Sequence, residues 1–347
     1  MVATGIVISF AFLAFLLSFL GFYIFHIVSK KRVVEHAVRK ETEERHAAKK
    51  YVPDMAGVVM LFVYACIYPL YIKFIVKDSM YYSDNQILIF YFAPLFLGGI
   101  GLLDDMMKRR TKSTRGLRAL FRFPMQVIIA CFIALALFNT THSWGSLYFI
   151  WVIIFILATI NAANFTDGLD GLLTGCAIIA VLGLVKFSVP DIYHYRTNIY
   201  GEYILFSDEP VLIFSVLPLS IMVAFLFFNT YPAKMFMGDC GSLFIGSFLA
   251  LLPIVAKNTY PFIVIGFMIY LALISVVIQV ISFKLTKRRI FPMTPFHHSF
   301  EKWGWHENHI VWFYYFLSFI FASLAIIYWK KLFNLFFHMI HPDKYVM

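Results

Sequence analysis

The chain has 347 residues, of which 61% are hydrophobic and only 14% charged, with a mean hydropathy of +0.79. This composition is too apolar for an ordinary soluble domain and excludes the soluble classes of enzyme and binding module. The net charge of +10 does not indicate a nucleic-acid partner, because in a membrane protein the positions of the basic residues matter more than their sum. The four cysteines lie at wide spacing with no CxxC pair, which predicts neither a disulfide framework nor a zinc site.

Ten apolar runs approach the length of about 20 residues that a helix needs to cross a bilayer, whereas a β-barrel would show short alternating segments. They span about residues 4–28, 55–77, 86–103, 117–138, 145–163, 172–189, 211–228, 242–257, 260–283 and 309–335. The first run has no basic residue before it and is longer than a signal-peptide core, so we expect a retained helix. We therefore predict an all-α integral membrane protein with about ten transmembrane helices. No repeat or linker divides the chain, which predicts one polytopic membrane domain over residues 1–347.

The basic residues predict the orientation of these helices. Most of the 29 lysines and arginines lie in the connections after the first, third, fifth, seventh and ninth runs, which the positive-inside rule places in the cytoplasm. An even number of helices then places both termini outside. The longest polar connection, residues 29–52, mixes both charge signs. It is either a solvated helix extension near anionic headgroups or a segment whose end, Lys49 and Lys50, faces a phosphate-bearing ligand.

Five polar segments all fall on the predicted cytoplasmic side. They are AKKYVPDMAG (48–57), GLLDDMMKRR (101–110), NAANFTDGLDG (161–171), FNTYPAKMFMGDCGS (228–242) and RRIFPMTPFHHSFE (288–301). Because the topology was assigned from apolar runs and basic residues alone, this clustering is independent of it. We expect one active surface at the cytoplasmic ends of several helices.

Five aspartates reach this predicted surface: Asp104, Asp105, Asp167, Asp170 and Asp239. A tandem pair at the end of a helix is usually a hydrated helix end, but five carboxylates with few nearby cations repel one another unless something positive binds. Oxygen ligands without cysteine favour Mg²⁺ or Mn²⁺ over zinc. Magnesium shares one or two carboxylates with substrate phosphates, so the other aspartates are left to act as bases or to orient their neighbours.

Glycines and aromatic residues flank these aspartates. Asp-Gly pairs, as in TDGLDG, are ordinary turn signals, but in GDCGS the residues Gly241 and Ser242 precede an apolar run whose helix N-terminus could face a phosphate. Phe165 and Phe236 each lie two or three residues before an aspartate. Core packing is the default for them, and stacking on a flat base is the alternative. His297 and His298 are either exposed polar residues or groups that donate hydrogen bonds or transfer protons beside phosphates.

Together, the segments NAANFTDGLDGL, FNTYPAKMFMGDCGSL and PFHHSFEKWGW resemble the motifs of the polyprenyl-phosphate N-acetylhexosamine-1-phosphate transferase superfamily. Within it they are most similar to the phospho-N-acetylmuramoyl-pentapeptide-transferase family, also called translocase I, in the same order from about Lys49 to the last run. The resemblance implies a ten-helix enzyme of the bacterial inner membrane with a cytoplasmic active site. It also implies magnesium-dependent transfer of phospho-N-acetylmuramoyl-pentapeptide from UDP to undecaprenyl phosphate, which yields lipid I and UMP for peptidoglycan, and a homodimer.

The same resemblance assigns roles to individual residues. Asp104 and Asp105 match the family's aspartate pair, with Asp104 as candidate base or nucleophile. Asp239 matches the main magnesium ligand and a catalytic position, with Asp167 as a second candidate ligand, and His297 matches a catalytic position. The expected substrate-binding residues are Lys49, Lys108, Asn161, Asn164, Phe165, Asp167, Asp170, Asn229, Phe236, His297 and His298. Lys49 and Phe236 match positions associated with the nucleoside.

Some positions depart from the family pattern and leave the donor sugar open. They are Val52, Asp54, Ala56, Arg122, Ser299, His306 and Asn308. One alternative is a related transferase that moves N-acetylglucosamine-1-phosphate, or another UDP-N-acetylhexosamine product, to undecaprenyl phosphate for teichoic acid or another surface glycan. The PFHHSFE segment favours the pentapeptide donor. A remote alternative, an ion-coupled transporter, predicts acidic residues near the middle of the spans, whereas here they lie at one end.

Overall fold

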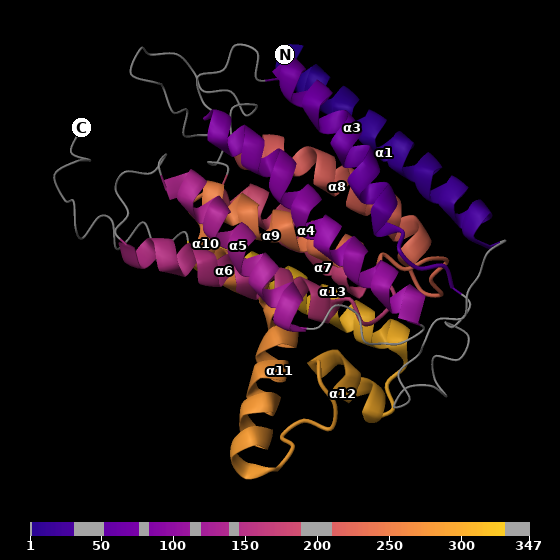
Figure 1. Ribbon diagram of the computed structural model, residues 1–347, viewed down its shortest axis with the longest axis vertical. Coiled ribbons are helices and arrows are strands. Elements are labelled where there is room, and N and C mark those ends of the chain that lie inside the picture. The colour runs from indigo at the N-terminus through magenta and orange to yellow at the C-terminus, as the bar shows by residue number, and fades with distance from the viewer. Residues whose placement is uncertain are drawn as a thin grey trace.

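The computed structural model describes residues 2–30, 52–75, 83–111, 119–138, 146–188 and 210–329, and within these ranges every regular element is a helix. Their arrangement is a bundle with one helix, α11, leaving it (Figure 1). The elements are α1 (Val2–Lys30), α3 (Gly57–Ile75), α4 (Asp84–Thr111), α5 (Ala119–Phe138), α6 (Ser146–Thr166), α7 (Leu172–Ser188), α8 (Pro210–Asn229), α9 (Gly238–Val255), α10 (Thr259–Ile265), α11 (Phe267–Thr286), α12 (Phe296–Lys302), α13 (Glu307–Leu324) and the π-helical turn η4 (Ala325–Trp329).

The predicted membrane-spanning helices are present. Among the described residues, eight helices are long and apolar enough to cross a membrane, and the cores of α5 and α7 add two shorter apolar helices. This confirms the all-α class with about ten spans. The ninth expected span is divided at Gly266 into the short α10 and the longer α11, a break that the hydropathy did not indicate.

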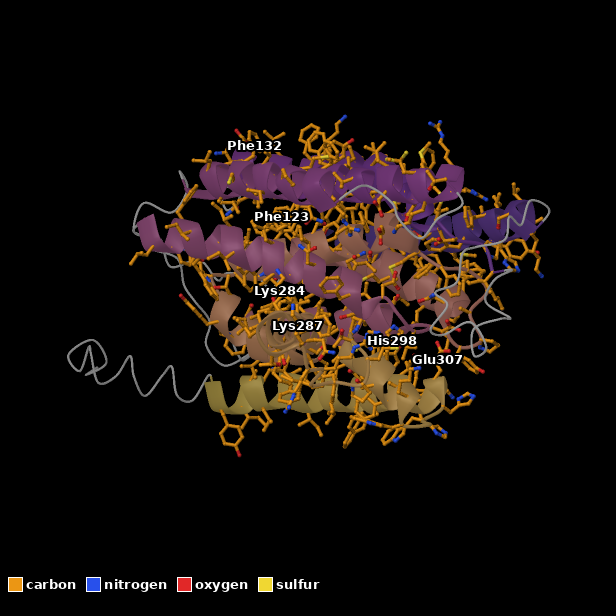
Figure 2. The ribbon with its side chains drawn as sticks, turned by 60° about the horizontal axis from the view of Figure 1, so that its bottom comes forward. Phe123, Phe132, Lys284, Lys287, His298 and Glu307 are labelled. Carbon is orange, nitrogen blue, oxygen red and sulfur yellow. The ribbon has the colours of Figure 1, made fainter. Side chains whose placement is uncertain are left out.

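Helix α9 lies at the centre of the bundle. It packs against α3, α4, α6, α7 and α8, and 83% of its most apolar window is buried, compared with 17% for α1. A helix that is apolar on all sides and enclosed by others is a core helix, whereas α1 and α5 present apolar side chains outward, as Phe123 and Phe132 of α5 do in Figure 2. The first residues of α9 are therefore fixed from several directions at once.

Glycines bring three helix ends together around the start of α9. A Cβ on Gly101 of α4 would overlap the backbone of Asp239, and a Cβ on Gly57 of α3 would overlap the backbone of Gly241. Small residues at such crossings let helix backbones approach closely, which is how helices pack inside a membrane. The carboxylates that follow Gly101 are therefore held directly beside the N-terminus of α9.

A tyrosine of α3 compensates for a proline of α4. Pro94 has no N–H, so the carbonyl of Phe90, four residues earlier, loses its helical donor. The hydroxyl of Tyr64 donates to this carbonyl at 2.6 Å. In the apolar interior of a membrane, an unpaired carbonyl carries a free-energy penalty of several kcal/mol. The contact with Tyr64 removes this penalty and also joins the two helices.

The reverse arrangement also occurs between the same helices. Pro69 of α3 deprives the carbonyl of Ala65 of its donor, and Tyr91 of α4 donates to that carbonyl at 3.4 Å. The two prolines and two tyrosines thus form a reciprocal pair of contacts between α3 and α4. These contacts fix the helices whose far ends carry the candidate site.

The chain turns back after α11 toward the bundle. Lys284 and Lys287 mark the end of α11 in Figure 2. Gln279 accepts from the backbone N–H groups of Ile290 and Phe291 at 3.0 Å each, and Ser275 accepts from that of Phe296 at 3.0 Å. These bonds hold the returning segment along α11 and place α12 beside the turn between α6 and α7.

Candidate active site

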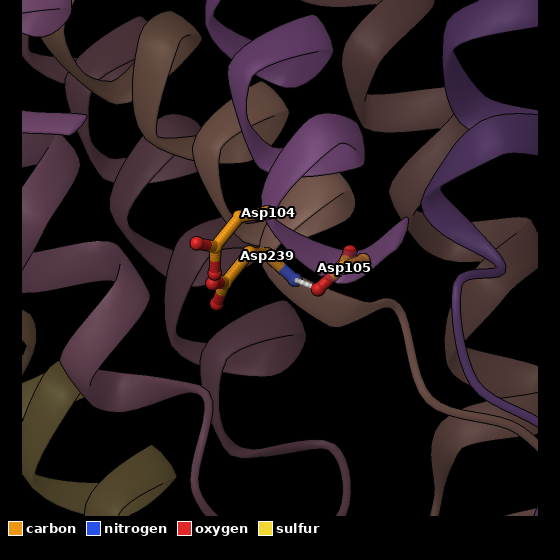
Figure 3. Close-up of side chains that lie close together, drawn as sticks. All are labelled: Asp104, Asp105 and Asp239. Atoms are coloured by element: carbon orange, nitrogen blue, oxygen red, sulfur yellow. Dashed lines mark hydrogen bonds between the residues drawn. The ribbon is translucent and has the colours of Figure 1, made fainter. Parts of the chain in front are cut away.

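Three carboxylates meet where α4 ends and α9 begins. Asp104 and Asp105 come from the last turns of α4 and Asp239 from the first turn of α9 (Figure 3). One ligand oxygen from each lies within 4.8 Å of the others. The sequence predicted that the segments around residues 101–110 and 228–242 converge, and the structure brings their aspartates into contact range.

Asp105 caps helix α9. Its Oδ1 accepts from the backbone N–H of Asp239 at 3.1 Å, drawn as a dashed line in Figure 3, and its Oδ2 accepts from that of Cys240 at 3.0 Å. The first N–H groups of a helix have no partner within the helix, and a negative charge there is also stabilised by the helix dipole. Both oxygens of Asp105 are therefore engaged in joining α9 to α4.

Two cationic side chains bridge the other two carboxylates. Lys108 Nζ lies 2.7 Å from Asp104 Oδ2 and 2.5 Å from Asp239 Oδ2. Arg122 Nη1 of α5 lies 2.9 Å from Asp239 Oδ2 and 3.6 Å from Asp104 Oδ2. Two positive groups thus face the buried carboxylate of Asp104 and the half-buried one of Asp239, which compensates the charge that would otherwise oppose their burial.

Asn164 at the end of α6 orients Asp239 from the opposite side. Its Nδ2 donates to Asp239 Oδ1 at 2.7 Å and to Ser242 Oγ at 2.8 Å. Asp239 therefore has one oxygen held by an amide and the other by Lys108 and Arg122. By contrast, Asn161 donates to Gln126 Oε1 at 3.1 Å and to a carbonyl of its own helix, and these bonds do not involve the aspartates.

Asp167 lies in the turn between α6 and α7, where its main charged neighbours are other carboxylates. Burial, followed by repulsion from Asp54, Asp239 and Asp105, raises the pKa of Asp167 well above its ordinary value. This environment favours the neutral form of the carboxyl over its charged form until a positive charge approaches it. Its surroundings favour a cation.

Asp170 and Asn229 brace the same turn. Asp170 Oδ2 accepts from the backbone N–H of Ala233 at 2.9 Å, and its own N–H donates to Glu307 Oε1 at 2.7 Å. Asn229 Oδ1 accepts from the N–H of Gly171 at 3.1 Å. Buried polar groups with several partners hold irregular backbone in place, so these two residues tie the turn to the segment before α9 and to α13.

Phe236 belongs to a paired stretch of backbone. Its N–H donates to the carbonyl of Pro53 at 2.8 Å, and its carbonyl accepts from the N–H of Ala56 at 3.0 Å. The ring is half-buried, as is that of Phe165. Asp54, one of the departures from the family pattern, accepts from the N–H of Met55 at 2.7 Å, and its Oδ1 lies near Gly238 beside Asp105.

Both adjacent histidines are buried. The interpretation of them as exposed polar residues is therefore wrong. Neither ring nitrogen of His297 has a hydrogen-bond partner among the described residues. Its ring lies 4.3 Å from that of His298 and 6.3 Å from that of Tyr314, measured between centroids. Burial, and then the neighbouring His298, lower the pKa of His297 well below its ordinary value, so it is neutral.

The expected site residues therefore form two adjoining groups. Asp104, Asp105, Lys108, Asn164 and Asp239 share one network at the start of α9, and Asp170, Asn229 and the two histidines lie around the turn 166–171. Lys49 lies outside the described residues.

Four further polar residues take part that were not among the expected site residues: Arg122, Ser242, Glu301 and Glu307. The sequence offered a signal for two of them: Arg122 is a basic residue inside the fourth apolar run, and Glu301 is an acidic residue three positions after His298.

The sequence is similar to those of known proteins. A family model described as glycosyl transferase family 4 matches residues 87–257, from α4 to just after α9. A phospho-N-acetylmuramoyl-pentapeptide-transferase of Halalkalibacterium halodurans is 33% identical over 303 residues, which cover 84% of this chain and 87% of the relative. Another such transferase, from Sulfurimonas denitrificans, is 35% identical over 289 residues (77% and 78% coverage), and one from Oceanobacillus iheyensis is 33% identical over 339 residues (93% and 97%). The chain belongs to the phospho-N-acetylmuramoyl-pentapeptide-transferase family.

Proposed function

We propose that this protein transfers phospho-N-acetylmuramoyl-pentapeptide from UDP to undecaprenyl phosphate, releasing UMP and forming lipid I for peptidoglycan synthesis. The observation that carries the proposal is the bridging of Asp104 and Asp239 by Lys108 and Arg122 at the ends of apolar helices. A lipid phosphate and a soluble nucleotide can meet only where a polar site opens at the membrane surface. The names of the relatives agree with this reaction.

In this reaction one phosphoanhydride is exchanged for another. An oxygen of the lipid phosphate bonds to the sugar-bearing phosphorus as the bond from that phosphorus to the UMP oxygen breaks. Little net free energy is involved, so the protein must mainly align two anions and reduce their repulsion. Lys108 and Arg122 supply fixed positive charge, and Asp104 acts in one of two ways. As a base it takes the proton of the lipid phosphate before the direct exchange. As a nucleophile its oxygen first displaces UMP from the sugar-bearing phosphorus, and the lipid phosphate then displaces Asp104.

The donor set fits a hard divalent ion. Oxygens of Asp104, Asp105 and Asp239 lie within 4.8 Å of one another. Both oxygens of Asp105 accept backbone N–H groups, whereas those of Asp239 contact side chains, which an ion can displace. We propose that Asp239 would hold Mg²⁺, or Mn²⁺ in its place, with Asp167 as a second ligand once it loses its proton. When bound, the ion supplies charge screening for the phosphates.

We further propose that the site faces the cytoplasm of a bacterial inner membrane, that both termini lie outside, and that the protein is a homodimer with one membrane domain. The distribution of basic residues supports the orientation. The transporter alternative predicts ionisable groups at mid-depth, whereas Asp104, Asp105 and Asp239 lie at helix ends.

The test uses purified protein, undecaprenyl phosphate, Mg²⁺ and one UDP-sugar at a time, with UMP release as the signal. UMP released from UDP-N-acetylmuramoyl-pentapeptide is the expected result. Release from UDP-N-acetylglucosamine alone would assign the protein to surface-glycan synthesis instead. No release with either donor would contradict the transferase function.

A further inference from the structure

We propose that Glu301 is a positioning residue for this transferase, because its carboxylate holds the Nδ1–H of His298 and thereby presents Nε2 to the turn 166–171. The inference rests on the proposed function for its kinetic consequence. The pairing itself can be measured without activity.

The first observation is the pair itself. His298 Nδ1 and Glu301 Oε2 are 2.5 Å apart, three residues from each other on helix α12. His298 is 9% exposed and Glu301 6% exposed. At such a distance between partly desolvated groups a charge-assisted hydrogen bond is strong and directional. The ring of His298 is therefore held in one orientation.

The second observation is what the opposite edge of the ring faces. A Cβ on Gly168 would lie 3.0 Å from His298 Nε2 and would overlap His297 Nε2, so both nitrogens lie against the backbone of the turn between α6 and α7. The turn carries Asp167 and Asp170, and Glu307 accepts from the N–H of Asp170 at 2.7 Å. Nε2 of His298 is thus directed to the edge of the acidic site.

The third observation is the contrast with His297. Neither of its ring nitrogens has a hydrogen-bond partner within the described residues, although the ring is completely buried. Among the described residues no carboxylate bonds to its ring, which lies between Gly168 and Tyr314. The two adjacent histidines therefore have different environments. Of the two, only His298 has its ring orientation fixed by a hydrogen bond to a described residue.

The physical consequence follows from the chemistry of imidazole. A neutral ring has one donor and one acceptor nitrogen, and the hydrogen bond at one nitrogen decides the state of the other. With Glu301 on Nδ1, Nε2 is an acceptor in the neutral ring and a donor in the charged ring. Without the carboxylate, the proton distributes between both nitrogens and the ring loses its fixed orientation. The loss affects the transition state more than ground-state binding.

The variants are Glu301→Gln, Glu301→Asp, His298→Asn and the double variant Glu301→Gln with His298→Asn. Lys302→Gln, at an exposed position of the same helix, is the matched control. We expect Glu301→Gln to lower kcat about 10- to 100-fold with KM nearly unchanged, as for other residues that orient a functional histidine. Glu301→Asp should restore part of the loss. In the His298→Asn background the Glu301→Gln change should have little further effect.

The independent measurement is nuclear magnetic resonance of protein labelled with ¹⁵N-histidine. The signals lost in His298→Asn identify His298, which should show a single Nδ1–H tautomer in the parent protein and a mixture in Glu301→Gln. An unchanged tautomer in Glu301→Gln, or an equal kinetic loss in the His298→Asn background, would overturn the inference. If UMP release fails in the parent protein but the tautomer responds to Glu301, then the proposed function is wrong and the pairing stands.

Discussion

Lys108 Nζ lies 2.5 Å from Asp239 Oδ2, so that one ammonium group links the last turns of α4 to the first turn of α9. The same ammonium lies 2.7 Å from Asp104 Oδ2. Lys108 and Asp239 are 131 positions apart in sequence, and the polar segment 101–110 supplies Lys108 and Asp104 whereas the segment 228–242 supplies Asp239. Through this link Asp104 and Asp239 form one charged unit.

Replacing either carboxylate of this unit should stop transfer without preventing insertion into the membrane. We expect Asp239→Asn and Asp104→Asn each to lower turnover at least about 100-fold, because each removes charge acting at the reaction centre. UMP release measures the loss. Asp84→Asn, an exposed position at the opposite end of α4, is the control and should retain activity. Near-normal turnover in Asp239→Asn or Asp104→Asn would refute the role of that residue.

Arg122 should be replaceable by lysine but not by glutamine. A single guanidinium nitrogen, Nη1, contacts Asp239 at 2.9 Å, so the contact is not the two-pronged type that only arginine makes. We expect Arg122→Lys to keep kcat/KM within about threefold and Arg122→Gln to lose about tenfold or more, roughly 1.4 kcal/mol of transition-state stabilisation. Steady-state kinetics with varied UDP-sugar test this. Equal losses in both variants would show that geometry rather than charge matters here.

Asp167 should make the response to magnesium depend on pH. Because its pKa is raised in the protein without a cation, the carboxyl must release a proton before it can approach Mg²⁺. The sign is therefore fixed: apparent magnesium affinity should rise as pH rises through the raised pKa. A chelator should abolish UMP release, and added Mg²⁺ should restore it.

The matched variant for this prediction is Asp167→Asn, which has no proton to release. UMP release is titrated against Mg²⁺ at several pH values. The apparent magnesium affinity of Asp167→Asn should depend less on pH than that of the parent protein. If the apparent magnesium affinity changes equally with pH in both proteins, Asp167 does not take part in cation binding.

Tyr64 should contribute more to stability than another buried tyrosine with a similar contact. Tyr64→Phe leaves the carbonyl of Phe90 without a donor, because Pro94 cannot supply one. Tyr71 donates to the carbonyl of Ile213 at 3.0 Å, but four residues later Leu217 has an N–H of its own. We expect Tyr64→Phe to cost about 1–3 kcal/mol and Tyr71→Phe less.

Thermal unfolding in detergent measures both tyrosine variants. Similar losses would indicate that the hydroxyls matter for packing alone and that Pro94 has no part in the effect. A loss confined to Tyr64→Phe supports the reciprocal contacts between α3 and α4.

Some features of the site were readable from the chain and others were not. The polar segments predicted the aspartates that meet, because acidic residues at the ends of apolar runs are costly and must be compensated. No pattern in the sequence indicated that both oxygens of Asp105 would accept N–H groups of α9, or that Asp170 would brace Ala233. The catalytic and metal-binding roles of Asp104, Asp167, Asp239 and His297 stay predictions.

The sequence by itself determined the number and type of the spanning elements. In a bilayer each backbone polar group must be satisfied within the protein, so an apolar run of sufficient length can only be a helix, and composition suffices to find it. Only the tertiary structure decided the division of the ninth span at Gly266, the burial of both histidines and the pairing of His298 with Glu301. These depend on which helices touch and at what depth, and glycines such as Gly101 and Gly168 set those distances through the side chains that they lack.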